Sequence, residues 1–514
     1  MSAEGRANIS ADRSAEAAEA GGQPIATGAV FHDGEASREM LPLTLLPLCV
    51  DLDGTLVKSD TLADSVCVLA RTHPWDLLRL PGWLLGGKAR FKREVSTRAP
   101  LDAAHLPYNE VLIVYLREQA ASGRPLYLST GADQHVADAV AHHLGLFDGV
   151  FSSDGVTNLT GTEKLRLLES RFGQGFAYVG NSRKDLPLLN ASKAAMLANT
   201  TVGLQSLLQR KKIPVQQVFQ DRATGFRSIW RALRVHQWAK NVLIFLPLIL
   251  AHALKMNMLL QSALAFLSFS LVASSTYIVN DVLDLAADRV HPRKRNRPFA
   301  AGDLSVIAGF CIAILLFAAG VAISIPMAPR FTFWLLVYCV VTLTYSLYFK
   351  RVVIVDVIIL SALYTLRILA GAAAARVPIS DWMAGFSIFF FFSLALVKRF
   401  SELENLRARG VAPSNGRGYL VHDMEQLRAF GTGSAFASIV VFTLYINNPD
   451  VRNLYHHPQR LWLLTPLLIW WMSRVWLRAS RGQMHEDPVI FALTDRASLL
   501  AGVAIFLIAL SASI

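Results

Sequence analysis

Nine apolar stretches follow one another between residues 241 and 511, and they constrain the fold of this chain more than any other feature. A helical crossing of a bilayer takes roughly 20 apolar residues, because every backbone N–H and C=O group in lipid must bond within its own helix. We therefore expect an all-α membrane domain of nine transmembrane helices. The stretches lie at approximately 241–254, 259–279, 304–325, 331–349, 353–375, 382–397, 429–447, 460–477 and 489–511.

The positive charge of the chain follows the same pattern. Its formal net charge is +12, and most of the excess lies in the loop before the first stretch and in those after the second, fourth, sixth and eighth. Because Lys and Arg concentrate in cytoplasmic loops, these loops and the N-terminal half are predicted to face the cytoplasm. The charge is thus explained by topology, and we expect no nucleic-acid partner. The four cysteines show no metal or disulfide spacing, which is typical of a reducing compartment.

The loop after the second stretch places acidic residues before basic ones. Asn280, Asp281, Asp284 and Asp288 are spaced so that a single helix would bring them onto one face. Carboxylates gathered at a membrane surface repel one another unless cations join them, and Mg²⁺ can bridge carboxylates to phosphate oxygens. The basic run that follows consists of Arg289, Arg293, Lys294, Arg295 and Arg297. The pattern favours a Mg²⁺-diphosphate site; the alternative is an acidic helix end followed by a positive-inside loop.

The motif itself, NDxxDxxxD followed by HPxKRxRPxAxG, resembles the first aspartate-rich motif of the UbiA superfamily of intramembrane transferases. The resemblance covers about the last 290 residues. It implies that Asp281, Asp284 and Asp288 hold a diphosphate through Mg²⁺, and that the enzyme transfers the group to which the diphosphate was attached. Nine spans in the predicted orientation also match this family.

The N-terminal part divides into three segments. Residues 1–40 are rich in Ala, Glu and Gly and are predicted to be a disordered tail. Residues 41–205 alternate apolar strands with helical patterns, which is typical of a parallel α/β sheet. Residues 206–225 are predicted to be a linker, and residues 226–241 a basic, aromatic helix in the membrane interface that begins the membrane domain, 226–514.

Polar residues follow the ends of the predicted strands, where the functional groups of parallel sheets gather. They are Asp51, Asp53, Thr130, Lys164 and Asp185. The segment at about residues 60–120, between the motif of Asp51 and Asp53 and the motif of Thr130, has a helical pattern and fits a small cap.

These positions resemble the motifs of the haloacid dehalogenase (HAD) superfamily of phosphohydrolases, over roughly residues 45–200. The resemblance implies that Asp51 of DxDGT is the nucleophile and Asp53 the general acid and base. Thr130, with Ser129 as the alternative, would bind a phosphoryl oxygen, and Lys164 would neutralise nucleophile and phosphate. Asp51, Asp53 and Asp185 would bind Mg²⁺. Asn181 stands where the family has aspartate, which predicts a weaker metal site.

The equivalent of the second aspartate-rich motif of ordinary UbiA prenyltransferases contains no DxxxD pair. Cations and tyrosines stand there or in nearby loops, and they suit a substrate that carries further phosphate. With the sequence RVHQWAKN near residue 240, this resembles the polyprenyl-phosphate phosphoribosyltransferase branch of the superfamily. The candidate substrate-binding residues are Lys240, Asn280, Arg293, Lys294, Arg297, Tyr345, Lys350, Arg367, Lys398 and Arg399.

The resemblances together imply a bifunctional enzyme of the bacterial inner membrane, with both active sites on the cytoplasmic side. The donor would be phosphoribosyl pyrophosphate, the acceptor a polyprenyl phosphate lipid, and the HAD domain would remove the 5-phosphate of the lipid product. Two alternatives remain at this point: an aromatic prenyltransferase with an unrelated phosphatase, and a lipid-binding or scaffolding protein with both sites silent. The membrane lipids are partners in any of these, and the sequence leaves the oligomeric state open, a homo-oligomer included.

Overall fold

The N-terminal domain is built on a six-stranded parallel sheet. The structure is a computed structural model that describes residues 46–223, 225–252, 255–408, 418–452, 455–484 and 488–513, so the predicted tail, 1–40, lies outside the described residues. The strands are β1 (Leu48–Val50), β2 (Leu126–Asp133), β3 (Gly149–Ser153), β4 (Ala177–Gly180), β5 (Ala194–Ala198) and β6 (Val215–Phe219). Their order is β3-β2-β1-β4-β5-β6, and β1 pairs with β2 and β4. The predicted α/β class is confirmed.

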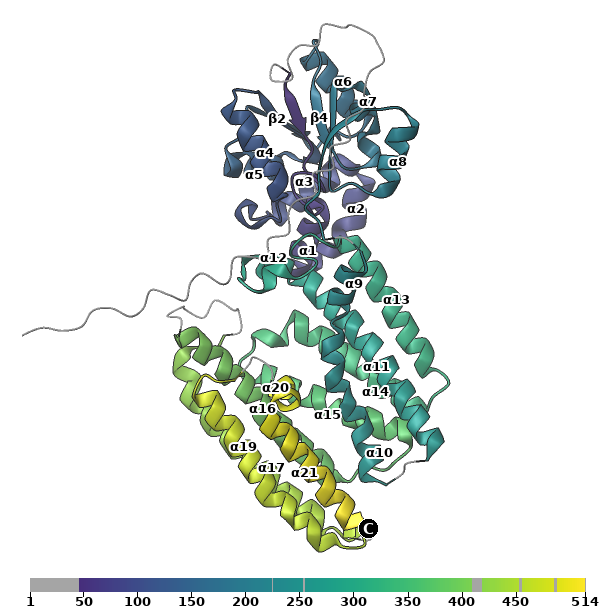
Figure 1. Ribbon diagram of the computed structural model, residues 1–514, viewed down its shortest axis with the longest axis vertical. Helices are drawn as coiled ribbons and strands as arrows, with labels where there is room; N and C mark the ends of the chain where they lie inside the picture. Colours follow the sequence, from purple (N-terminus) through teal and green to yellow (C-terminus); the bar gives the residue numbers. More distant parts are fainter. Residues whose placement is uncertain are drawn as a thin grey trace, which may run out of the picture. The chain divides into compact units, whose positions relative to one another are not determined.

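Helices cover both faces of this sheet (Figure 1). Leu48 and Val50 point into a cluster with α4 (Glu110–Ala121) and α5 (Gln134–Leu144). Cys49, between them, points to the other face and packs with α6 (Thr162–Arg171), α7 (Leu186–Ala191) and α8 (Val202–Arg210). Because successive side chains of a strand face opposite sides, three apolar residues are enough to anchor β1 in two hydrophobic layers.

A small helical cap follows β1, as predicted. It consists of α1 (Thr61–Thr72), α2 (Leu80–Leu85) and α3 (Lys88–Arg98), which share a core around Leu69, Trp83 and Val95. Asp60 caps α1, since its side chain accepts a hydrogen bond from the amide of Ala63 at 2.9 Å. The cap is shorter than expected because α4, within the predicted 60–120 segment, packs on the sheet.

The predicted linker, 206–225, is wrong in its boundaries. It contains β6, whose residues pair with β5, and the last turn of α8. The strand was missed because Gln216, Gln217 and Val218 are exposed at the edge of the sheet, so the segment has no apolar alternation. The α/β domain therefore extends to Phe219.

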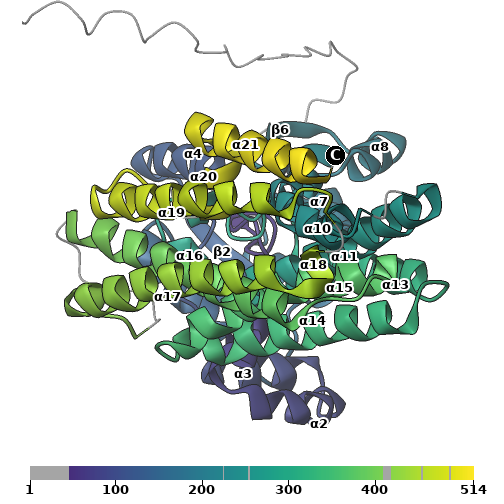
Figure 2. The same cartoon turned by 90° about the horizontal axis from the view of Figure 1, so that it is seen from below.

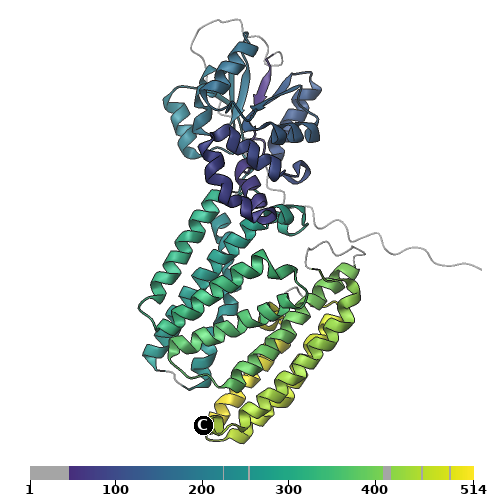
Figure 3. The same ribbon diagram turned by 180° about the vertical axis from the view of Figure 1, so that it is seen from behind.

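The C-terminal part is helical, and seven of its helices are long and apolar enough to cross a membrane. These are α11 (Met256–Leu283), α13 (Val306–Ser324), α14 (Pro329–Leu347), α15 (Val355–Ala375), α16 (Asp381–Ala408), α17 (Met424–Asn447, within the span Val421–Asn447) and α21 (Arg496–Ser513). Figure 2 shows α16, α17, α19 and α21 running side by side, and Figure 3 shows the helical part from behind. The predicted all-α class of the membrane domain is confirmed.

The first and eighth predicted spans coincide with helical segments that do not count among the seven long apolar helices. The first coincides with the apolar segment Val235–Leu250, which is a 3-10 helix, η5 (Val235–Phe245), followed by α10 (Leu246–Leu250). The eighth coincides with η9 (Pro458–Leu463) and α19 (Leu464–Ser480). Within the described residues, the structure thus gives seven spans by length and composition, not the nine predicted.

Two predicted helices are interrupted beside the aspartate motif. The helix expected at 226–241 ends with α9 (Phe226–Leu233), because Arg234 adopts a left-handed conformation at φ +51°. The helix that carries the motif ends at Leu283, and a separate helix, α12 (Leu285–Val290), follows Asp284. These interruptions set the direction of the charged side chains described next.

Candidate active sites

The carboxyl end of the parallel sheet holds a buried ion pair. Asp51 follows β1 directly, and its Oδ1 lies 2.8 Å from the Nζ of Lys164 on α6. The ammonium group also donates to the carbonyl oxygen of Ser129, at 3.0 Å, and to the hydroxyl of Tyr178, at 3.1 Å. Both partners are almost fully buried. Lys164 is therefore fixed beside the predicted nucleophile, as the family pattern requires.

Burial changes the proton affinity of both motif aspartates. Desolvation raises the pKa of Asp51 to about 6, although Lys164 opposes the shift. Desolvation and the charge of Asp60 raise the pKa of Asp53 to about 7. The Asp53 side chain accepts a hydrogen bond from the amide of Thr61 at 2.7 Å, at the start of α1. A carboxyl group that titrates near neutral pH is suited to both give and take a proton.

Asp185 is held in place by four donors. Its Oδ2 accepts from the amides of Asn181 (3.2 Å) and Ser182 (2.9 Å) and from the Ser182 hydroxyl (2.8 Å), while Oδ1 accepts from Tyr178 at 3.1 Å. The Asn181 side chain packs against Gly54 so closely that a Cβ there would lie 1.9 Å from its Nδ2. Gly54 also has φ +75°, a conformation that favours glycine. Both the close contact and the backbone conformation therefore require the glycine of DxDGT.

The two candidate phosphoryl-binding hydroxyls are both fully buried in the middle of β2, because the strand continues to Asp133, beyond the predicted end at Leu128. The hydroxyl of Thr130 accepts a hydrogen bond from the amide of Ala132 at 3.0 Å. The Ser129 hydroxyl has no hydrogen-bond partner within the described part of the chain.

A cavity of about 380 Å³ opens above these groups. Asp51, Asp53, Lys164, Asn181 and Asp185 line it, and so do residues of the cap. The cap contributes Lys92, whose ammonium group donates to Gly131 O (2.5 Å) and Asn158 Oδ1 (2.7 Å). Ser305, next to the start of α13, also lines the cavity.

The donor set of this cavity fits Mg²⁺ chemically. Asp185 raises the pKa of Asp51, which means that the two carboxylates lie close enough to repel each other. A divalent cation bound by oxygen ligands would relieve that repulsion. Within the residues the structure describes, no three acidic, histidine or cysteine side chains already converge as a metal cluster.

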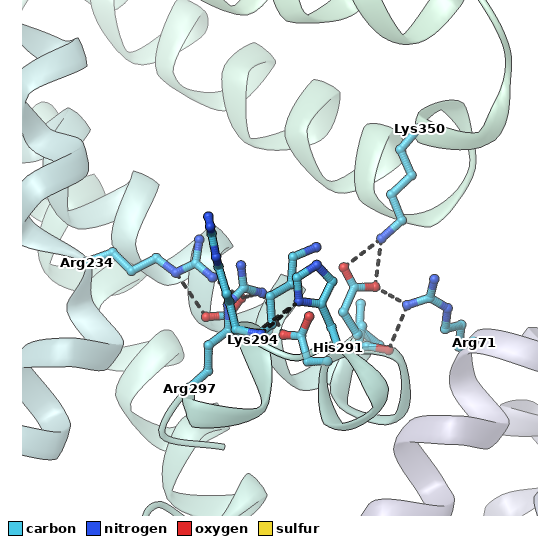
Figure 4. A network of polar contacts seen from close by, with 11 residues as sticks. Arg71, Arg234, His291, Lys294, Arg297 and Lys350 are labelled. Atoms are coloured by element: carbon cyan, nitrogen blue, oxygen red, sulfur yellow. Dashed lines mark hydrogen bonds and ion pairs between the residues drawn. The ribbon is translucent and has the colours of Figure 1, made fainter. Parts of the chain in front are cut away.

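The aspartate motif of the membrane domain forms a second polar site, shown in Figure 4. Arg234 binds Asp281 through two bonds, with Nε at 3.0 Å from Oδ2 and Nη2 at 2.5 Å from Oδ1. Arg297 joins Asp281 (3.1 Å) and Asp288 (2.6 Å) through its Nη1. Asp281 and Asp288 are buried, whereas the Arg297 side chain is 26% exposed.

Asp284 has different partners. Lys350, on η7 (Phe349–Arg351), donates to both of its oxygens, at 2.7 and 2.9 Å. The guanidinium group of Arg71 on α1 contacts Oδ1 of the same carboxylate, which also accepts from Lys350 (Figure 4). The single helix predicted for Asp281, Asp284 and Asp288 is wrong, because α11 ends at Leu283 and α12 begins at Leu285, and Asp284 has other cation partners than Asp281 and Asp288.

The carboxylate oxygens of the motif are thus held by guanidinium and ammonium groups. Carboxylates are the usual ligands of Mg²⁺, and cations that already sit on them mark positions where positive charge is favoured. The chemistry fits a metal, provided that the cations move to the phosphate oxygens when it binds. Asn280 is half-buried directly before Asp281, with its backbone carbonyl bonded to the amide of Asp284 at 2.9 Å.

The remaining predicted cations of the loop lie near this site. Lys294 belongs to a short 3-10 helix, η6 (Lys294–Asn296), and its amide donates to the His291 ring at 3.3 Å (Figure 4). Arg293, which precedes it, is exposed. The buried Lys240 lies on η5, next to Asn241.

Other candidates take part in buried contacts between membrane helices. Arg399 on α16 binds Asp356 of α15 at 2.6 Å and Tyr345 of α14 at 3.1 Å, and Tyr419 also donates to Asp356. Lys398 is its half-buried neighbour on α16. Arg367 on α15 binds the side chain of Asn241 at 2.9 Å, and its guanidinium group lies over the rings of Phe269, Tyr338 and Tyr364.

Two residues of the membrane-domain site were missed from the sequence. Arg234 lies in a basic, aromatic segment whose charge was assigned to the membrane interface. Arg71 lies 213 residues from Asp284 in another domain, and no motif or spacing relates them. A positive φ at a non-glycine residue would have marked Arg234, but a sequence does not display it.

Residues 241–493 match the model of the UbiA prenyltransferase family. The decaprenyl-phosphate phosphoribosyltransferase of Mycolicibacterium smegmatis is 31% identical over 43% of this chain and 71% of its own length. The chain belongs to the UbiA prenyltransferase family.

Two rhizobial proteins are also similar. The protein y4nM of Sinorhizobium fredii is 38% identical over 89% of both chains, so the similarity extends through the α/β domain as well as the UbiA domain. The nodulation protein NoeC of Azorhizobium caulinodans is 35% identical over 54% of this chain and 90% of its own length. The chain is therefore an integral membrane enzyme of the UbiA family joined to an α/β domain with HAD-like motifs.

Proposed function

We propose that this chain is a bifunctional enzyme that transfers 5-phosphoribose from phosphoribosyl pyrophosphate to a polyprenyl phosphate and then removes the 5-phosphate. The observation that carries the proposal is the surplus of cations at the aspartate motif. Three carboxylates meet Arg71, Arg234, Arg297 and Lys350 there, with Lys294 close by. Such a site suits a donor and an acceptor that both carry phosphate.

The second aspartate cluster of prenyltransferases has no counterpart here. Asp356, the one carboxylate in that region, is fully buried and occupied by Arg399 and Tyr419. The similarity to a decaprenyl-phosphate phosphoribosyltransferase supports the same donor and acceptor.

In the transfer step, an oxygen of the lipid phosphate attacks C1 of the ribose, and the bond from C1 to the diphosphate breaks. The attacking phosphate is already ionised, so no strong general base is needed. Arg297 and Lys294 would hold the departing diphosphate, and Lys350 and Lys398 are candidates for the lipid phosphate. Arg399, predicted with Lys398, is 2% exposed and bound to Asp356 and Glu402, so it would act through these partners. The protein acts mainly by positioning and by charge stabilisation.

In the phosphatase step, Asp51 attacks the 5-phosphate, and the ribose oxygen leaves with a proton from Asp53. Water then hydrolyses the phosphoaspartate while Asp53 takes the proton of the water. Lys164 holds charge on the nucleophile throughout, at 2.8 Å. The pKa of Asp53 near neutrality supports both of its roles.

Mg²⁺, when bound, would supply positive charge to the diphosphate and to the transferred phosphoryl group. Asp281, Asp284 and Asp288 would hold it in the UbiA domain, with Asn280 as a substrate-binding residue beside them. Asp51, Asp53 and Asp185, with Asn181, would hold it in the phosphatase domain.

The membrane topology belongs to the same proposal. Val235–Leu250 and α19 would complete nine crossings, with both active sites on the cytoplasmic side of a bacterial inner membrane. The distribution of Lys and Arg among alternate loops supports this orientation.

The test is to incubate the detergent-purified protein and Mg²⁺ with polyprenyl phosphate and phosphoribosyl pyrophosphate labelled in the ribose. We expect label in the lipid extract, without the 5-phosphate for the wild type and with it for Asp51→Asn. Wild-type protein that accumulates the 5-phosphorylated lipid would refute the phosphatase step. Transfer from a prenyl diphosphate to a ring acceptor, with no label in lipid, would favour an aromatic prenyltransferase instead. Loss of every Mg²⁺-dependent turnover would favour a lipid-binding protein.

A further inference from the structure

The phosphatase domain is fastened to the UbiA domain by a buried ion pair. Arg289 on α12 donates to Asp64 of α1 at 2.8 Å and to the hydroxyl of Ser59 at 3.0 Å. The Asp64 side chain is fully buried and that of Arg289 is 6% exposed. Cys67 of α1 packs into an apolar cluster with Val282 and Leu285. These contacts join the domains without any help from Arg71.

Arg71 is placed differently, at the last turn of α1. It uses its Nη1 for both of its contacts, with Asp284 and, at 3.4 Å, with the carbonyl oxygen of Leu283. Its Nε and Nη2 donate to no group in the part of the chain that the structure describes. The Arg71 side chain is 27% exposed, so it is not closed off from solvent beside Asp284.

The charge around Asp284 is unbalanced. This carboxylate, 18% exposed, meets two cations, Arg71 and Lys350. The other two carboxylates also meet two cations between them: Arg234 pairs with Asp281, and Arg297 pairs with both Asp281 and Asp288. A site with one more cation than carboxylates attracts an anion, and a guanidinium fork binds phosphate oxygens through two parallel donors.

We infer that Arg71, a residue of the phosphatase domain, is a substrate-binding residue of the transferase. Its Nε and Nη2 bind the diphosphate oxygens of the donor while Nη1 and Lys350 orient Asp284. The transferase site is then complete only when the phosphatase domain is docked. This inference rests on the proposed use of a diphosphate donor. It holds whether the donor transfers phosphoribose or a prenyl group.

The experiment is calorimetric titration of the full-length protein in detergent with inorganic pyrophosphate and Mg²⁺. We expect Arg71→Gln to weaken binding by about 10- to 100-fold, as for the loss of a hydrogen bond between charged groups. Arg71→Lys should recover part of the affinity, because it restores the charge but not the fork. The matched control is Arg79→Gln, which removes an exposed arginine that pairs with Asp76 in the same domain and should bind like the wild type.

Two further measurements separate the outcomes. Hydrolysis of p-nitrophenyl phosphate and the unfolding temperature should match the wild type in Arg71→Gln, which shows that the phosphatase domain is intact. Arg289→Gln, which breaks the buried pair, should lower the unfolding temperature. If pyrophosphate affinity in Arg71→Gln equals that of the wild type, or falls only with the unfolding temperature, the inference is overturned.

The labelled-donor assay keeps this result apart from the proposed function. Pyrophosphate binding that depends on Arg71, together with transfer of a prenyl group instead of ribose, would refute the proposed donor and leave the role of Arg71 intact. Phosphoribosyl transfer together with an unchanged affinity of Arg71→Gln for pyrophosphate would support the proposed donor and refute the role of Arg71. A wild-type protein that binds no pyrophosphate refutes both.

Discussion

Asp51 is a buried and Asp53 a half-buried carboxyl group, and both have a high proton affinity when no metal is bound. Their pKa values of about 6 and about 7 lie well above the ordinary value of 3.8. The cause is desolvation, so each group costs free energy when it ionises in the folded state. A divalent cation bound beside these carboxylates would offset the free energy that their ionisation costs.

The pH dependence of stability follows from this shift. A carboxyl group with a raised pKa in the folded state binds its proton more tightly than the unfolded chain does, so stability is lost as the pH rises through the folded pKa. Without Mg²⁺, we expect Asp53 to lower the free energy of unfolding by about 2 kcal/mol between pH 5.5 and pH 7.5. Unfolding temperatures followed by tryptophan fluorescence in EDTA would measure it.

Asp53→Asn provides the control for that prediction. The difference in unfolding temperature between the two pH values should shrink in this variant, and saturating Mg²⁺ should shrink it in the wild type. A wild-type protein whose stability rises with pH over this window would contradict the assignment.

Among the elements, α15 approaches η5 so closely that only a glycine fits. A Cβ on Gly371 would lie 2.1 Å from the carbonyl oxygen of Ile244, a backbone atom that cannot move aside. This contact fixes the apolar segment Val235–Leu250 against a long span and keeps Arg234, at its start, above Asp281.

Gly371→Ala should therefore separate α15 from η5. We expect a loss of about 2–3 kcal/mol from overpacking, seen as a lower unfolding temperature in detergent, and a weaker affinity for pyrophosphate. Gly433→Ala on α17 is the matched control, because a Cβ there has nothing within 4 Å. Equal stability of the two variants would show that η5 can shift freely.

The ion pair between α15 and α16 gives a second prediction for the elements. Asp356 and Arg399 are both almost fully buried, and Arg399 also pairs with the less buried Glu402 at 2.6 Å. Arg399→Met should therefore cost about 3–5 kcal/mol, mainly by leaving the buried Asp356 carboxylate without its cation. The double variant Arg399→Met, Asp356→Leu should recover most of that loss. A single variant as stable as wild type would contradict the pairing.

Elements with a strong periodic signal could be predicted from the sequence, and those that depend on distant contacts could not. The helix Thr162–Arg171 and the strand Leu48–Val50 lie where their apolar patterns indicated. The strand β6 was not predicted because its exposed glutamines interrupt the alternation of apolar and polar residues. The break at Asp284 escaped notice as well, because residues on both sides of it favour a helix.

The candidate sites show the same limit. Asp51 and Lys164 could be paired from motif order alone, and the structure brings them to 2.8 Å. Tyr345, Lys350 and Arg399 were grouped as cations and tyrosines near one place, but their partners differ: Lys350 binds Asp284, whereas Arg399 and Tyr345 join the network around Asp356. Partner choice depends on helix orientation, which sequence spacing does not specify.

For the whole molecule, the proposed topology predicts which residues meet which side of the membrane. Lys88, exposed in the cap, and Asp381, exposed at the start of α16, should lie on opposite sides. In intact cells, a membrane-impermeant maleimide should label Asp381→Cys but not Lys88→Cys. Permeabilised cells should show labelling of both. Labelling of Lys88→Cys in intact cells would reverse the orientation.

Helix α1 reaches from one active site to the other. At its first residue, the amide of Thr61 holds Asp53, and at its last turn Arg71 meets Asp284. At 1.5 Å per residue, these two positions are roughly 15 Å apart along the helix. In the proposed reaction sequence, a newly made lipid would travel only a few times the length of a sugar phosphate to reach the second active site. Its transfer between the sites would compete with a short diffusive step, so we expect little of the intermediate to escape into the surrounding bilayer.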